Sequence, residues 1–140
     1  MTIQSIQFVK DNLLLFAIAL VSGGMLLWPL IRRGTGGPWA STLEATQMIN
    51  RQDAPLIDVR EDAEFAKGHI VGARHIPLAQ LETRAKELQK FKSKPVIVCC
   101  ATGNRSSVAM TTLKKLGFEN VYNLAGGFAG WQQAGLPVEK

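Results

Sequence analysis

The chain has 140 residues, 46% of them hydrophobic and 19% charged, so it is long enough for one ordinary domain and too apolar to be disordered. Its two cysteines are adjacent, at Cys99 and Cys100, which excludes a disulfide-rich scaffold and a cysteine-based zinc site of ordinary spacing. The net charge of +5 is modest and scattered, apart from a short basic run between Lys86 and Lys94. We therefore expect neither a nucleic-acid partner nor a metal site.

After a short tail, residues 1–11, the segment 12–31 is apolar and uncharged. A helix of this length spans about 30 Å, the thickness of the hydrocarbon core of a bilayer. A cleaved signal peptide would have a shorter apolar stretch, roughly 7–15 residues, and a small-residue cleavage site after it. A domain of this size could not bury a helix that is apolar on all sides. The segment is therefore predicted to be one transmembrane helix, with the lipid bilayer as its partner.

Residues 32–38 form a basic and glycine-rich linker that would hold the remaining chain, 39–140, close to the membrane. Arg32 and Arg33 follow the apolar segment, whereas Lys10 is the only basic side chain before it. The positive-inside rule then favours an N-terminus outside and a C-terminal domain in the cytoplasm. A reactive thiol also survives better in that reducing compartment.

Patterns typical of strands and helices alternate from Trp39 onward. The sequence Ser41-Thr42-Leu43-Glu44 is a capping box and predicts a helix to about Asn50. Apolar strands are predicted at 56–60, 95–99 and 120–124, and helices at 61–68, 79–90, 106–116 and 128–134. Strands separated by helices pair in parallel through right-handed crossovers, so the predicted class of 39–140 is a single α/β domain.

The candidate site is the loop after the most apolar strand, because open α/β sheets bind ligands at the carboxyl ends of their strands. Cys100 opens this loop, and a helix is expected to begin at Ser106. The helix dipole and the charge of Arg105 should lower the pKa of Cys100 and make its thiolate a nucleophile. The backbone N–H groups of the loop should cradle an anion or a terminal sulfur. These groups belong to Ala101, Thr102, Gly103, Asn104, Arg105 and Ser106.

Residues 39–140 resemble a single rhodanese (sulfurtransferase) domain over nearly their whole length. The matching pieces are 56–60, 64–65, 68–70, 72–73, 75–77, 100–105, 124–127 and Trp131. Their order and spacing together are specific, and with the N-terminal helix the chain resembles bacterial membrane-anchored members of this family. The resemblance implies a three-layer α/β/α fold, a parallel five-stranded sheet with a short first strand near Trp39, and a place in the bacterial inner (plasma) membrane as a single-pass protein.

The resemblance also implies a persulfide mechanism on Cys100. The thiolate would take the sulfane sulfur of thiosulfate or of a persulfide donor and pass it to a thiol or cyanide acceptor. The two half-reactions constitute covalent catalysis and need no cofactor. Arg105 would attract the anionic donor and steady the leaving group.

Asp58 and Arg60 are candidate supporting residues. Asp58 corresponds to a strand-end aspartate of the family that positions the loop, and Arg60 could reach the donor anion; the simpler alternative is that the two side chains pair with each other. Attack by a preformed thiolate needs no general base, so His69 and His75 are expected to be structural or surface residues. Trp131 is expected to pack rather than to touch substrate.

Cys99 introduces a first alternative function. Counted from Cys99, Arg105 completes the C-x5-R-S pattern of cysteine phosphatases, a group of which is related to rhodaneses. Counted from Cys100, the loop is the shorter C-x4-R of the sulfurtransferases. Because side chains alternate along a strand, Cys99 should be a small buried hydrophobe. Sulfur transfer is therefore the leading interpretation, and phosphatase activity is a distant alternative.

A second alternative is a membrane-tethered adaptor with a rhodanese fold, which would bind other membrane proteins and turn over substrate only incidentally. Fold alone does not settle function. Ala19 and Gly23 form a small-xxx-small pair that could pack against another helix. The presence of both Cys100 and Arg105 argues against an inactive domain.

Overall fold

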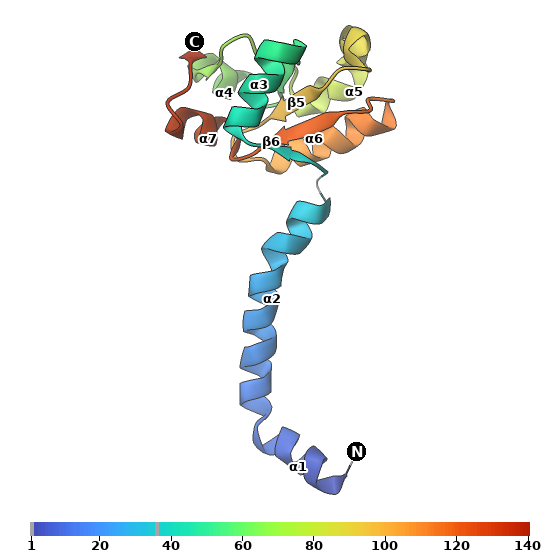
Figure 1. Ribbon diagram of the computed structural model, residues 1–140, viewed down its shortest axis with the longest axis vertical. Coiled ribbons are helices and arrows are strands. Elements are labelled where there is room, and N and C mark those ends of the chain that lie inside the picture. Colours follow the sequence, from blue (N-terminus) through green and yellow to red (C-terminus); the bar gives the residue numbers. More distant parts are fainter. Residues whose placement is uncertain (1, 36) are drawn as a thin grey trace. The chain divides into compact units, whose positions relative to one another are not determined.

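The computed structural model describes residues 2–35 and 37–140, and the side chains of 29–35 lie outside that description. The chain separates into two units, Met1–Thr35 and Gly36–Lys140. Figure 1 shows both units.

The N-terminal unit consists of two helices, α1 (Ile3–Asp11) and α2 (Leu13–Thr35). Asn12 separates them and closes α1, because its side-chain nitrogen donates a 2.8 Å hydrogen bond to the carbonyl oxygen of Phe8. The segment expected to be a plain tail, 1–11, thus contains a helix. α2 also runs four residues into the segment 32–38 expected as a linker, since each added residue gains a hydrogen bond and arginine is a good helix former. The rest of that linker includes Gly36, which lies outside the described residues.

The segment predicted to span a membrane lies mostly in α2. Within the described part of the chain, no single helix is long and apolar enough to cross one. Ile3–Asp11 and Leu13–Trp28 satisfy the requirement of length and composition only together, and they are bent by 71° at the break between them.

The C-terminal unit is built on a five-stranded sheet in the order β1-β6-β5-β2-β4, and every neighbouring pair is parallel. The expected parallel five-stranded sheet, including its short first strand at Trp39, is confirmed. All four residues of the central strand β5 are buried, as is usual for a strand covered on both faces. The strands are β1 (Trp39–Ala40), β2 (Leu56–Asp58), β4 (Arg74–His75), β5 (Val96–Cys99) and β6 (Val121–Leu124).

Helices cover both faces of the sheet, which gives the three-layer α/β/α arrangement (Figure 1). One layer contains α3 (Thr42–Gln52) and α7 (Gly127–Gln133), and the other contains α6 (Asn104–Lys115) and the segment between β4 and β5. Because side chains alternate along β5, Ile97 and Cys99 pack into the first layer, whereas Val96, Val98 and Cys100 pack into the second.

The edges of the domain hold two short elements that the sequence analysis did not predict as strands. β3 (His69–Ile70) and β7 (Val138–Glu139) pair in an antiparallel two-stranded sheet. Between β2 and β3 lies α4 (Asp62–Lys67), at the expected place. The capping box of α3 is also present, with the backbone N–H of Glu44 donating to Ser41 Oγ at 3.2 Å and that of Ser41 donating to Glu44 Oε2 at 2.8 Å.

The segment expected to be one helix over 79–90 is less regular. It comprises a 3₁₀ turn η1 (Leu78–Gln80), a short α5 (Leu81–Arg84) and a longer 3₁₀ stretch η2 (Ala85–Phe91). The buried residues of η2 are Ala85, Leu88 and Phe91. They are three residues apart, and a 3₁₀ helix has three residues per turn, so this geometry aligns all three on the core. Burial of Phe91 thus explains the tighter winding.

Candidate active site

Cys100 lies directly after β5, at the carboxyl end of the central strand, and is 1% exposed. The backbone N–H of Gly103 donates a 2.9 Å hydrogen bond to Cys100 Sγ. Ser106 Oγ lies 3.3 Å from the same sulfur. The loop therefore folds back over the thiol that the sequence predicts to be the nucleophile.

Gly103 makes this reversal of the chain. Its φ of 111° is left-handed, and a Cβ there would lie 3.0 Å from the ring of Trp39, so the position suits glycine. Gly103 is also the N-cap of α6, which begins at Asn104 and not at Ser106 as expected from the sequence. Ser106 consequently belongs to the first turn of α6, where backbone N–H groups have no partner within the helix and can face the sulfur.

Opposing effects act on the Cys100 thiol. Burial raises its pKa, but hydrogen bonds from the Ser106 hydroxyl and from the backbone N–H groups of Ser106, Gly103 and Thr102 outweigh burial, so that the pKa is lowered. The N–H groups that reach the sulfur thus belong to three of the six residues expected in the cradle. Of the remaining three, Asn104 and Arg105 begin α6, and the carbonyl oxygen of Ala101 accepts a hydrogen bond from the N–H of Ala129.

The start of α7 holds the other side of the loop. The N–H of Phe128 donates to the carbonyl oxygen of Cys100 at 2.8 Å, and that of Ala129 donates to Ala101 at 3.2 Å. Gly127 has a φ of 59°, and a Cβ there would overlap the carbonyl oxygen of Cys100 and lie 2.7 Å from that of Ala101. The close approach of α7 to the loop therefore depends on a glycine at this position.

Cys99 points away from this site. It is fully buried in the layer of α3 and α7, and burial, with the negative charge of Asp58, raises the pKa of its thiol. The expectation that Cys99 is a small core residue is confirmed. A thiol of this kind is a poor nucleophile near neutral pH.

Arg105 has a partner that the sequence analysis did not assign to it. Its Nη1 and Nη2 donate to Glu64 Oε1 and Oε2 at 2.6 and 2.8 Å, a bidentate pair between α6 and α4. The two hydrogen bonds hold the pKa of Glu64 at about 2 and raise the pKa of Arg105. The guanidinium expected to attract a donor anion is therefore bound to a carboxylate, although both side chains remain about one-third exposed.

Asp58 and Arg60 form a buried pair with each other, as the simpler alternative expects. Arg60 Nε lies 3.0 Å from both carboxylate oxygens of Asp58, and its Nη2 donates to Oδ2 at 2.8 Å. Arg60 also donates to the carbonyl oxygen of Gly68 at 2.8 Å and stacks over the ring of Phe128, 4.1 Å from its centroid. The pair thus ties β2 to the end of α4 and to α7.

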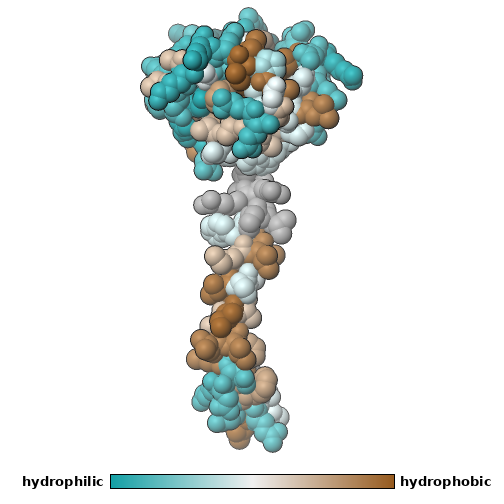
Figure 2. All heavy atoms as spheres, turned by 90° about the vertical axis from the view of Figure 1, so that its left-hand side faces the viewer, coloured by the Kyte–Doolittle hydropathy of each residue, from teal (hydrophilic) through white to brown (hydrophobic). Residues whose placement is uncertain are grey.

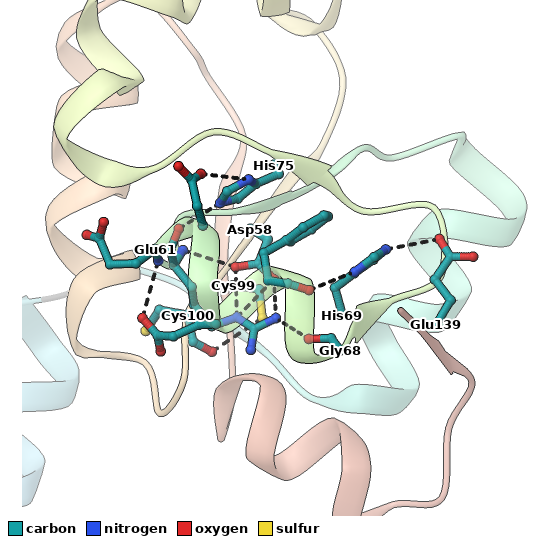
Figure 3. Close-up of polar contacts among 12 residues, drawn as sticks. Asp58, Glu61, Gly68, His69, His75, Cys99, Cys100 and Glu139 are labelled. Carbon is teal, nitrogen blue, oxygen red and sulfur yellow. Dashed lines mark hydrogen bonds and ion pairs between the residues drawn. The ribbon is translucent and has the colours of Figure 1, made fainter.

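The two histidines enclose an aromatic ring. The rings of His69 and His75 stack on opposite sides of Phe65, with centroids 3.8 and 4.2 Å away. His75 Nε2 bonds the carbonyl oxygen of Arg60 at 2.8 Å. Figure 3 shows Asp58 among these groups, with His69 reaching toward Glu139. Both imidazoles therefore have structural contacts, in keeping with the sequence interpretation.

Trp131 is 5% exposed and its indole N–H donates to the carbonyl oxygen of Pro137 at 2.9 Å, so it packs as expected. Among residues 2–35 and 37–140, no group of three or more His, Cys, Asp and Glu side chains could hold a metal ion.

Sequence reasoning missed Asn123, a buried polar residue on β6 beside the loop. The only signal for it is its place in the apolar strand, where a polar side chain that points inward needs hydrogen-bond partners.

Comparison with known proteins agrees with this geometry. The family model described as "Rhodanese-like domain" matches residues 41–134. A rhodanese-related protein from Thermoplasma volcanium has a solved structure that superposes with a TM-score of 0.63 at 31% identity, covering 73% of this chain and 97% of that one. The chain therefore belongs to the rhodanese family.

Three similar proteins comprise two uncharacterized proteins and one thiosulfate sulfurtransferase. YqhL of Bacillus subtilis, an uncharacterized protein, is 51% identical over 78 residues, 56% of this chain and 60% of YqhL. YibN of Escherichia coli, also uncharacterized, is 38% identical over 96 residues, 68% of this chain and 67% of YibN. GlpE of Haemophilus influenzae, a thiosulfate sulfurtransferase, is 40% identical over 96 residues, 69% of this chain and 89% of GlpE. The match thus covers less than two thirds of YqhL but most of GlpE.

Proposed function

We propose that this chain is a membrane-anchored sulfurtransferase that carries a sulfane sulfur as a persulfide on Cys100. The observation that carries the proposal is the position of Cys100 Sγ, at the end of the central strand and held by the N–H of Gly103 at 2.9 Å. The hydrogen bonds that lower its pKa also favour the thiolate, the form that attacks sulfur. The similarity to GlpE supports thiosulfate as one donor.

The chemistry proceeds in two half-reactions. In the first, the Cys100 thiolate attacks the outer sulfur of thiosulfate, an S–S bond forms to Sγ, and the S–S bond of the donor breaks so that sulfite leaves with the electron pair. In the second, a thiolate or cyanide attacks the terminal sulfur, and Cys100 leaves as a thiolate. A persulfide donor would react in the same way and release its thiolate.

The N–H groups of Thr102, Gly103 and Ser106 would stabilise negative charge in both half-reactions, since that of Gly103 donates to Sγ at 2.9 Å and all three lower the pKa of Cys100. Arg105 would guide an anionic donor only in competition with Glu64, which occupies both of its terminal nitrogens. The buried pair of Asp58 and Arg60 would not touch the donor. It would support the loop through Phe128, on which Arg60 stacks and whose N–H binds the carbonyl oxygen of Cys100.

The anchor would be the segment 12–31, most of which lies in α2, although Leu13–Trp28 meets the length and composition requirement only together with Ile3–Asp11. Most apolar side chains in the described part of α2 are exposed. Leu14, Leu20 and Leu26 are each more than 70% exposed. Figure 2 shows hydrophobic residues gathered along this helix. Apolar surface of this extent is stable in contact with lipid. The proposed location is the bacterial inner membrane, with residues 39–140 in the cytoplasm.

The alternatives receive less support. A phosphatase that used the C-x5-R-S pattern would need Cys99 as its nucleophile, and burial raises the pKa of that thiol. An adaptor that bound membrane proteins would have no use for hydrogen bonds that favour a thiolate on Cys100. Sulfur transfer through Cys100 agrees both with the unreactive Cys99 thiol and with the hydrogen bonds that favour a Cys100 thiolate.

The test is sulfur transfer from thiosulfate to cyanide by the full chain in non-ionic detergent. We expect Cys100→Ala to abolish thiocyanate formation, because the persulfide has no attachment point, and Cys99→Ala to retain it. Mass spectrometry after thiosulfate alone should find one added sulfur on Cys100. A folded Cys99→Ala variant without activity, beside an active Cys100→Ala variant, would contradict the proposal.

A further inference from the structure

Asn123 lies on β6, is fully buried and binds the loop that follows Cys100. Its side-chain nitrogen donates to the carbonyl oxygen of Gly103 and to Ser107 Oγ, both at 3.0 Å. A carbonyl oxygen can only accept a hydrogen bond, so the atom facing Gly103 must be Nδ2. The orientation of the amide follows, and Oδ1 faces Ser106.

The Ser106 hydroxyl has one proton and two neighbours. Ser106 Oγ lies 2.6 Å from Asn123 Oδ1 and 3.3 Å from Cys100 Sγ. Because Oδ1 only accepts, the hydroxyl donates its proton to Asn123 in this arrangement. It then presents a lone pair to the sulfur, which suits a protonated Cys100 that donates S–H. The hydrogen bond by which this hydroxyl lowers the pKa of Cys100 therefore forms only after the hydroxyl turns from Oδ1 to Sγ.

We propose that Asn123 is a positioning residue for sulfur transfer, which holds the Ser106 hydroxyl turned away from Cys100 and releases it to the sulfur when the thiolate forms. This inference rests on the proposed function. When Cys100 ionises, its proton goes to solvent, while the hydroxyl keeps its own proton and rotates from Oδ1 to Sγ. When a persulfide forms, Sγ carries no charge and the hydroxyl returns to Asn123.

The rotation has a cost, because it leaves the buried Oδ1 without a partner. Asn123 therefore favours the thiol and the persulfide over the free thiolate. Removal of Oδ1 should free the hydroxyl to stabilise the thiolate. The carbonyl oxygen of Gly103 would keep one partner, because Ser107 Oγ donates to it at 2.9 Å.

The test measures the ionisation of Cys100 and requires no turnover. Every variant carries Cys99→Ala, so that Cys100 is the single thiol, and the full chain is kept in non-ionic detergent. Asn123→Leu preserves the branched shape of asparagine but removes its polar atoms. Ser106→Ala removes the hydroxyl, the double variant combines the two changes, and Ser107→Ala is the matched control. The readout is the rate of alkylation by iodoacetamide against pH.

We expect Asn123→Leu to lower the pKa of Cys100 by roughly 0.5 to 1, the effect of one gained hydrogen bond. The same change in the Ser106→Ala background should shift the pKa by less than about 0.2, because no hydroxyl remains to be freed. Ser107→Ala should leave the pKa unchanged. Arg105 and Cys99 are the titratable groups coupled to the charge on Cys100; position 99 is alanine throughout, and Arg105 with its partner Glu64 is the same in all variants.

An unchanged or raised pKa in Asn123→Leu would overturn the inference, and so would an equal shift in both backgrounds. Circular dichroism checks folding, and Asn123→Ala replaces Asn123→Leu if the latter fails to fold. Sulfur transfer by the reference protein is assayed separately. An active reference with no coupling between positions 123 and 106 rejects this inference alone, whereas an inactive reference rejects the proposed function.

Discussion

Under the proposed function, Arg105 would have two competing partners, the Glu64 carboxylate and an anionic sulfur donor. The pair with Glu64 is bidentate but about one-third exposed, and ion pairs of this exposure contribute about 0.2–1 kcal/mol. A contact with a donor anion inside the site would be worth about 1.5–3 kcal/mol. The donor should therefore win at high concentration, with an affinity reduced by the competition.

We accordingly expect Glu64→Gln to lower KM for thiosulfate up to about fivefold, because it frees the guanidinium. Arg105→Ala should raise KM by about tenfold or more. Steady-state kinetics at constant ionic strength checks both, with the exposed Glu82→Gln as a control of equal charge change. A higher KM in Glu64→Gln would mean that the pair itself builds the site.

Alkylation of the wild-type chain provides a prediction about pH. Since the pKa of Cys100 lies below its ordinary value of about 9, thiolate should persist as the pH falls past the point where an ordinary thiol is protonated. Iodoacetamide should therefore modify Cys100 at neutral pH, while Cys99, whose pKa is raised by burial, stays unmodified until the protein unfolds. Peptide mapping by mass spectrometry identifies the site. Preferential modification of Cys99 in the folded protein would reverse the assignment.

Among the elements, α7 has the most direct effect on the loop. Its first N–H groups bind the carbonyl oxygens of Cys100 and Ala101, and Arg60 stacks on its Phe128. These contacts hold the loop by its carbonyl oxygens. A shift of α7 would therefore turn the loop N–H groups away from the sulfur.

Gly127→Ala should displace α7 from the loop and reduce sulfur transfer by at least about tenfold, since an added Cβ would overlap the carbonyl oxygen of Cys100. Gly135→Ala is the matched control. Gly135 also has a positive φ, of 71°, but has nothing within 4 Å of an added Cβ. The Gly135→Ala variant should therefore lose about 1 kcal/mol of stability and keep its sulfurtransferase activity. Equal losses of activity in the two variants would show that backbone strain alone, and not contact with the loop, is responsible.

At the scale of the whole molecule, the proposed anchor makes a prediction about topology. In intact cells, a membrane-impermeant maleimide should label Ser5→Cys, whereas Lys140→Cys should react only after lysis. Cys99 and Cys100 are replaced by alanine in both variants. This labelling pattern is expected because more positive charge follows the apolar segment, at Arg32 and Arg33, than precedes it, at Lys10. Labelling at position 140 but not at position 5 before lysis would place sulfur transfer outside the cytoplasm.

The sequence by itself determined the α/β class, most elements of the domain and the opposite layers into which the adjacent cysteines pack. These follow from local patterns, because the alternation of side chains along 95–99 alone puts Cys99 and Cys100 on opposite faces of the sheet. The extent of η2 and the start of α6 were less predictable. η2 buries its own Phe91 in the core, and Gly103 lies close to the ring of Trp39, and such tertiary contacts are not local properties of the sequence.

Only the tertiary structure decided the partners of the site residues. Glu64 is 41 residues from Arg105, and Asn123 is 17 residues from Ser106. No spacing rule links such positions, because they meet through the order of the strands and the crossovers between them. The hydrogen bonds to Cys100 could be anticipated from the sequence, because the residue opens a loop at a strand end. Which carboxylate binds its arginine, and which amide holds its serine, depends on how the chain folds back on itself.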